Sequence, residues 1–208
     1  FNVLLFSGGN SVLAEKSLQA NPENIRKAVD LIDRQKGGGG TELLPAMKRA
    51  LSLPKAEGVS RTLVIATDGY VTVEEEIFDL MRNHLGDANM FPFGIGTAVN
   101  RHLLEGMARV GMGEPFILTK PEEIQEKTDQ FRKMIQSPVL THVTLDFGRF
   151  NAYDVEPSSI PDVFAERPIL VFGKWRGNPE GEITLRGVSG SHPFTGRINP
   201  FKEKASLS

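Results

Sequence analysis

Residues 63–69 read Leu-Val-Ile-Ala-Thr-Asp-Gly, a short apolar run that ends in a polar turn. A run of this length is typical of a strand that is buried on both faces of a parallel sheet. Residues 2–6 form a second run of this kind, and residues 89–96 and 116–118 are further strand candidates. Together these runs predict the strands of one sheet.

Segments with helical periodicity lie between these runs. Asn21-Pro22-Glu23 supplies a capping side chain, a proline suited to the first helical position and an acid in the first turn. We expect a helix there whose buried face consists of Ile25, Val29 and Ile32. Further helical patterns begin after Thr41, Thr72, Asn100 and Thr119. The alternation over residues 1–136 predicts an α/β, Rossmann-like fold with a doubly wound, mostly parallel sheet.

The pattern changes after Ser137-Pro138. Residues 142–147 alternate polar and apolar side chains, as a half-buried antiparallel strand does. Further strand candidates are residues 168–175 and 182–186. We therefore expect two domains, an α/β domain over residues 1–136 and a small antiparallel β module over residues 137–208.

The expected β module holds about 70 residues, and a domain of that size buries a limited core. We expect Phe172 and Trp175 to fill this core. We also expect the module to stay packed on the rest of the chain or on sequence upstream of it.

Composition and charge exclude several classes of function. The 208 residues include 24 basic and 26 acidic side chains, and a formal charge of −2 is too balanced for general nucleic-acid binding. Cysteine is absent, which excludes disulfides, thiolate metal sites and cysteine nucleophiles. No apolar run approaches the roughly 18–20 residues of a membrane-spanning helix. We therefore expect neither nucleic-acid binding nor a membrane span in this chain.

Two polar residues stand where ligands collect in a doubly wound sheet, beyond the carboxyl ends of the strands. Thr41 follows a run of four glycines, and Asp68 directly follows an apolar strand. A hydroxyl and a carboxylate are hard oxygen ligands that suit Mg²⁺, Mn²⁺ or Ca²⁺. A structural interpretation competes with this one, because Thr41 could cap its helix and Asp68 could form a turn with Gly69.

Other kinds of chemistry find less support in the sequence. The glycine run is followed by Thr41 instead of the lysine of a phosphate-binding loop, which argues against nucleotide binding. The four histidines lie far apart and none has a partner at metal-binding spacing. Ser7, Asp68 and His102 occur in the chain, but no motif ties them into a catalytic triad. We therefore expect no catalytic residues and no enzyme.

Four segments, in this order and spacing, resemble a von Willebrand factor A domain: residues 1–7, 39–43, 63–69 and 93–96. Residues 160–164 and 169–173 resemble the segment that follows this domain in inter-alpha-trypsin-inhibitor heavy chains and their bacterial relatives. The resemblance covers nearly the whole chain. It implies a protein-interaction or cell-adhesion module in an extracellular or cell-envelope setting.

The resemblance also implies a divalent cation held by three loops at a metal-ion-dependent adhesion site. Thr41 matches the second loop and Asp68 the third, and the carboxylate of a protein ligand would complete the coordination of the metal. The first loop, Asp-x-Ser-x-Ser, is absent from the sequence. In this family that loop lies upstream of where Phe1 falls. We therefore expect Mg²⁺, Mn²⁺ or Ca²⁺ to bind in the intact parent protein and to bind this chain weakly or not at all.

In this family the first strand and the first helix would also lie upstream of Phe1. The strands at residues 3–6 and 63–66 would then flank an empty position, and their exposed edges favour self-association. Two other functions stay open: a metal-assisted hydrolase or phosphoryl-transfer enzyme that uses Asp68, and a structural spacer with a vestigial cation site.

Overall fold

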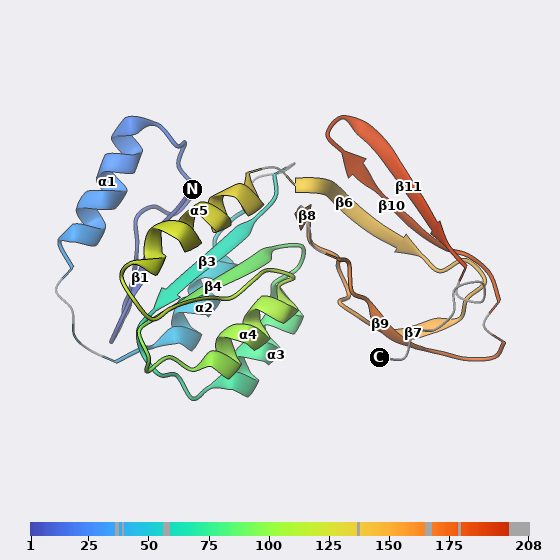
Figure 1. Ribbon diagram of the computed structural model, residues 1–208, viewed down its shortest axis with the longest axis horizontal. Coiled ribbons are helices and arrows are strands. Elements are labelled where there is room, and N and C mark those ends of the chain that lie inside the picture. The colour runs from blue at the N-terminus through green and yellow to red at the C-terminus, as the bar shows by residue number, and fades with distance from the viewer. Residues whose placement is uncertain are drawn as a thin grey trace.

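The computed structural model describes residues 1–35, 38, 40–55, 59–136, 138–164, 168–178 and 180–199. Gly37 and Gly39 of the glycine run, Ser137 at the expected domain boundary and the last nine residues lie outside this set. Figure 1 shows an α/β part that is followed along the chain by a part made of strands. In the described residues, no helix is long and apolar enough to cross a membrane.

The α/β part contains a parallel sheet and a separate hairpin. The sheet has the order β3-β4-β5 and consists of β3 (Thr62–Thr67), β4 (Asn89–Ile95) and β5 (Phe116–Leu118). The hairpin pairs β1 (Leu4–Phe6) with β2 (Asn10–Val12) in antiparallel fashion. The predicted α/β fold with a parallel sheet is therefore confirmed.

Five helices accompany these strands in the described residues: α1 (Pro22–Asp33), α2 (Leu43–Ser52), α3 (Glu74–His84), α4 (Arg101–Val110) and α5 (Glu123–Ile135). Two of them begin at the asparagines expected from the sequence. Asn21 Oδ1 accepts from Asn24 N–H at 2.8 Å, and Asn100 Oδ1 accepts from Leu103 N–H at 3.0 Å. These side chains satisfy backbone donors that a helix N-terminus leaves without an internal partner.

Helices cover both faces of the parallel sheet. On one face, Ile65 and Met90 pack against residues of α2, α3 and α4, including Leu43, Ile77 and Leu103. On the other face, an aromatic cluster joins Phe91, Phe93 and Phe116 of the sheet to Phe131 of α5. The alternation of side chains along β4 sends Met90 to the first face and Phe91 to the second.

The hairpin and the parallel sheet leave a gap between them. Over the described residues, β1 pairs with β2 and β3 pairs with β4, but β1 and β3 do not pair with each other. Val64 on β3 is 51% exposed. Ile25, Val29 and Ile32 of α1 are also exposed, so the prediction that they form a buried face is wrong for this chain. An amphipathic pattern buries a face only where another segment packs against it.

The part after residue 137 consists of strands in the residues described. They are β6 (Pro138–Asp146), β7 (Ala152–Glu156), β8 (Val163–Phe164), β9 (Phe172–Trp175), β10 (Ile183–Ser189) and β11 (His192–Ile198). One antiparallel sheet has the order β11-β10-β6-β8, and β7 pairs with β9. This agrees with the small antiparallel β module that the sequence predicts.

The core of this part differs from the expected one. Its buried members are Leu140, Val143, Ile160 and Val163. Phe172 is 68% exposed and Trp175 is 55% exposed, so the expectation that they fill the core is wrong. Among the described strands β9 pairs with β7 alone, and all four of its residues are exposed.

A short segment joins the strand part to the α/β part. Phe164 of β8 is buried in the aromatic cluster, with its ring 5.8 Å from that of Phe91. Asn89 Nδ2 at the start of β4 donates to the backbone carbonyl of Asp162 at 3.0 Å. Ser60 Oγ donates to the carboxylate of Asp162. The strand part therefore shares a core with the α/β part, and the boundary between residues 136 and 137 stays a prediction.

Candidate functional site

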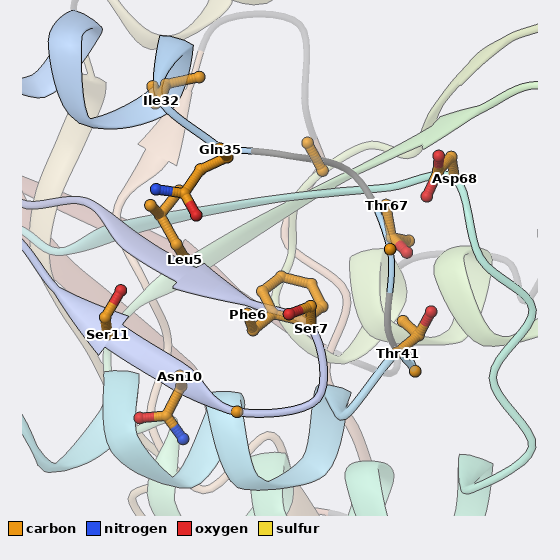
Figure 2. A pocket seen from close by; sticks show the side chains of 14 residues that line it. Leu5, Phe6, Ser7, Asn10, Ser11, Ile32, Gln35, Thr41, Thr67 and Asp68 are labelled. Atoms are coloured by element: carbon orange, nitrogen blue, oxygen red, sulfur yellow. The ribbon is translucent and has the colours of Figure 1, made fainter.

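A cavity of about 680 Å³ opens where the hairpin, the glycine run and β3 come together. Figure 2 shows the side chains that line it. Its lining residues are Leu5, Phe6, Ser7, Gly9, Asn10, Ser11, Ile32, Gln35, Gly38, Gly40, Thr41, Ala66, Thr67 and Asp68. Both sequence-predicted residues, Thr41 and Asp68, are therefore at one cavity.

Thr41 lies just before α2 and is half-buried. The N-cap of α2 is Glu42, and this helix end has no side-chain cap hydrogen bond. The interpretation of Thr41 as a helix cap is therefore wrong. Its side chain instead packs against Gly69, where an added Cβ would lie 3.1 Å from Thr41 Cβ and would overlap Thr41 Oγ1.

Asp68 is the first residue after β3, and its side chain is exposed. The turn that follows is held by its neighbour, because Gly69 N–H donates to Thr67 Oγ1 at 3.2 Å. The alternative in which Asp68 itself holds this turn is therefore also wrong. Within the described part of the chain, the Asp68 carboxylate forms no hydrogen bond and no ion pair, so its charge is available to a ligand.

The loop after Asp68 is fixed from the other side by Asn100. The Asn100 side chain donates to the Val71 carbonyl at 2.7 Å and to Glu74 Oε1 at 2.5 Å. Hydrogen bonds from its own backbone N–H and from Asn100 lower the pKa of the Glu74 carboxyl. Val71 is buried in the core. Because Thr67 and Val71 are both anchored, the residues between them are held in place.

The donor atoms at the cavity fit a hard cation with a partly hydrated shell. A carboxylate and a hydroxyl are the oxygen ligands that Mg²⁺, Mn²⁺ and Ca²⁺ prefer. No group of three or more His, Asp and Glu side chains that could hold a metal ion occurs in the residues that the structure describes. Water or a ligand would therefore have to supply most of the six or more oxygens that such a cation takes.

The structure adds two hydroxyls that the sequence analysis did not propose for this site. Ser7 and Thr67 line the same cavity as Thr41 and Asp68. Ser7 follows β1 and Thr67 ends β3. This place at the carboxyl end of a predicted strand could have identified both residues from the sequence. His102 does not line the cavity and packs at 6.2 Å against the ring of Phe78. Ser7, Asp68 and His102 are therefore not assembled into a triad.

Comparison with known proteins places the chain in a family. The family model described as von Willebrand factor type A domain matches residues 1–115. The mouse von Willebrand factor A domain-containing protein 5B1 is 31% identical over 176 residues, which cover 83% of this chain and 14% of that protein. Mouse inter alpha-trypsin inhibitor, heavy chain 4, is 27% identical over 205 residues, which cover 91% of this chain and 21% of that protein.

A solved structure, the von Willebrand factor type A protein from Catenulispora acidiphila, shares the fold with a TM-score of 0.66 at 16% identity. The match covers 95% of this chain and 56% of that one, so it includes the strand part. The chain spans about a fifth or less of the length of the two curated relatives. Since the family model covers more than half of its 208 residues, the chain belongs to the von Willebrand factor type A domain family.

Proposed function

We propose that this protein-interaction domain binds a protein ligand through a divalent cation, Mg²⁺ or Mn²⁺, held by Thr41 and Asp68. One observation carries the proposal. The two side chains, 27 residues apart in sequence, reach one cavity, and the local structure uses neither of them as a helix cap or turn holder. Both oxygens are therefore available for a ligand.

The residues at the cavity have two roles, to supply oxygen ligands and to hold the loop in position. Asp68 supplies the negative charge, and Thr41 supplies a neutral oxygen whose place is set by Gly69. Thr67 and Asn100 keep the backbone around Asp68 in position. When bound, the cation would act as a Lewis acid that attracts a carboxylate of the protein ligand.

The lining of the cavity favours binding over hydrolysis. A hydrolase needs a nucleophile and a base within hydrogen-bond reach of each other. Among the lining residues that the structure describes, Asp68 is the one acid, and none is a histidine or a lysine. The alternative of a metal-assisted hydrolase therefore gains no support from this site.

Titration with Mn²⁺, followed by electron paramagnetic resonance and by calorimetry, tests the proposal. We expect the wild-type chain to bind one ion with a Kd of about 10⁻³ M, the weak end of the range for oxygen sites. Asp68→Ala should lower the affinity at least about tenfold because it removes the charged ligand. Thr41→Val keeps the packing against Gly69 but removes the hydroxyl, and should lower the affinity by a smaller factor.

Asp30→Ala is the matched control, because Asp30 is an exposed aspartate on α1 that does not line the cavity. Its affinity should equal that of the wild type. Absence of Mn²⁺ binding at about 10 mM, tenfold above the expected constant, would show that Thr41 and Asp68 do not hold the ion in this chain. Binding that survives Asp68→Ala unchanged would show that the ion sits elsewhere.

A further inference from the structure

The strand β11 forms an exposed edge of the antiparallel sheet. In the order β11-β10-β6-β8 it lies at the end opposite β8, the strand whose Phe164 is buried against the α/β part (Figure 1). Over the described residues β11 pairs with β10 alone, and all of its residues except Gly196 are exposed. An edge strand of this length offers backbone donors and acceptors to which another strand can pair.

The pairing with β10 shows which backbone groups of β11 point outward. The Val188 carbonyl of β10 accepts from Thr141 Oγ1 of β6 at 3.3 Å, so it points away from its β11 partner, Pro193. Bonded and non-bonded pairs alternate along an antiparallel ladder. The backbone groups of Pro193, Thr195 and Arg197 therefore face the free edge. Because proline has no N–H, the free donors belong to Thr195 and Arg197.

The inner face of the sheet is uncovered at β11. Leu140 and Val143 of β6 are buried, and Leu185 of β10 packs against them. Phe194 and Ile198 of β11 are 43% and 45% exposed. A cavity of about 390 Å³, lined by Leu140, Leu185 and Phe194 among others, opens beside them. An added strand with apolar side chains on this face would cover Phe194 and Ile198.

The outer face of β11 carries a cation. The Arg197 guanidinium lies 3.8 Å from the Glu182 carboxylate, and both side chains are more than half exposed, so this ion pair contributes little stability. From His192 to Ile198, β11 contains no acidic residue. An acid on an added strand opposite Arg197 would form a favourable cross-strand pair. A second copy of β11 could not supply that acid.

We propose that β11 is a docking edge for an extended segment of a partner protein in which apolar and acidic residues alternate. The segment pairs with the free backbone groups of Thr195 and Arg197. Its apolar side chains lie beside Phe194 and Ile198, and its acids lie on the face of Arg197. In strand addition of this kind the backbone hydrogen bonds provide affinity and the side chains provide specificity. The surface is separate from the proposed cation site.

Fluorescence anisotropy with labelled peptides tests the proposal on the whole chain, with EDTA present so that the proposed cation site takes no part. The probe is a peptide of the length of β11 that alternates valine and glutamate, and the matched peptide has lysine at each glutamate. We expect the glutamate peptide to bind about tenfold more tightly, because opposite charges across strands attract and like charges repel. The same peptide N-methylated at every residue should bind at least about tenfold more weakly, because it lacks backbone donors.

Variants locate the binding on the chain. Arg197→Glu should invert the preference, so that the lysine peptide binds more tightly. The matched control is Arg132→Glu, because Arg132 is an exposed arginine on α5 with a similarly long ion pair, 3.6 Å to Asp129. Phe194→Ala should weaken binding about two- to fivefold, the effect of one cross-strand aromatic contact. Phe172→Ala removes an exposed ring from β9 and should leave binding unchanged.

Several outcomes would overturn the proposal. They are absence of binding at about 1 mM peptide, equal binding of the two charged peptides, and a preference that Arg197→Glu does not invert. Binding that Val64→Lys abolishes would place the peptide on β3 instead. If no peptide binds and sedimentation velocity shows that Phe194→Ala splits a dimer of the wild type, a second copy occupies this edge and the proposal is wrong. The cation site is tested by Mn²⁺ alone, so its failure is distinguishable from all of these.

Discussion

The side chain of Thr41 occupies the space that a side chain at Gly69 would need. A Cβ added to Gly69 would lie 3.1 Å from Thr41 Cβ and 3.3 Å from Thr41 Cγ2, and it would overlap Thr41 Oγ1. Packing against Thr41 therefore requires glycine at this position. Because Gly69 adjoins Asp68, the same contact brings Thr41 to the loop that carries Asp68.

Gly69→Ala should displace Thr41 and weaken both the fold and the site. Overpacking of this kind costs about 1–3 kcal/mol in the free energy of unfolding. We expect a urea unfolding curve to show this loss and Mn²⁺ titration to show reduced affinity. Gly8→Ala is the control, because a Cβ there would meet no atom within 4 Å. Equal behaviour of the two variants would disprove the steric role of Gly69.

Phe164→Ala should destabilise the whole protein, because Phe164 is buried in the aromatic cluster shared with the α/β part. Loss of a buried phenylalanine costs about 3–5 kcal/mol in the free energy of unfolding. Phe172→Ala removes an exposed ring and should change stability by less than about 0.5 kcal/mol. Chemical denaturation of both variants measures the contrast. A small effect of Phe164→Ala would mean that the two parts do not depend on a common core.

The 208-residue chain should self-associate in solution. The unpaired edges of β1 and β3 and the exposed Val64 form a surface that another strand can join. Val64→Lys should reduce association, since a charge on such a surface opposes strand addition. Val59→Lys replaces an equally exposed valine outside β3 and should not. Sedimentation velocity measures the mass of the species in solution, and a strictly monomeric wild type of 22.9 kDa would contradict the prediction.

The stability of the protein should depend on pH through Asp162. Burial raises the pKa of the Asp162 carboxyl above its usual value of 3.8, against the opposing effect of a hydrogen bond from the His142 backbone. The folded state therefore keeps this proton to higher pH than the unfolded state does. The stability that Asp162 contributes is fully present below pH 3.8 and is lost as the pH rises through the folded pKa.

Urea unfolding of the wild type and of Asp162→Asn across the acidic range checks this sign. The free energy of unfolding of the wild type, relative to the variant, should fall as the pH rises. Asparagine does not titrate, so any bond that it forms with Ser60 adds a constant offset, and the change of relative stability with pH reports on the Asp162 carboxyl. A relative stability that increases with pH would show that the pKa is lowered instead.

Most of the secondary structure could be predicted because its causes are local. The caps at Asn21 and Asn100 and the buried runs of β3 and β4 depend on neighbouring residues. The family resemblance added the two candidate cation residues. Ser7 and Thr67 could have been included, since both stand where a predicted strand ends and both line the cavity.

Burial could not be predicted in the same way. Ile25, Val29 and Ile32 have the spacing of a buried helix face and yet are exposed, because no segment of the described chain covers them. Phe172 and Trp175 stand on a strand that pairs with one neighbour. Whether an apolar side chain is covered depends on which distant segment reaches it, and periodicity does not carry that information.

The amino-acid sequence by itself determined the alternation of helices with the strands of the parallel sheet, the presence of strands after that part and the positions of Thr41 and Asp68 at element ends. Only the tertiary structure decided that Thr41 packs on Gly69 instead of capping α2, and that Thr67 instead of Asp68 holds the turn. The reason is physical. A hydroxyl or a carboxylate can interact with several possible partners. Which partner it meets depends on how loops from distant positions in the chain approach each other.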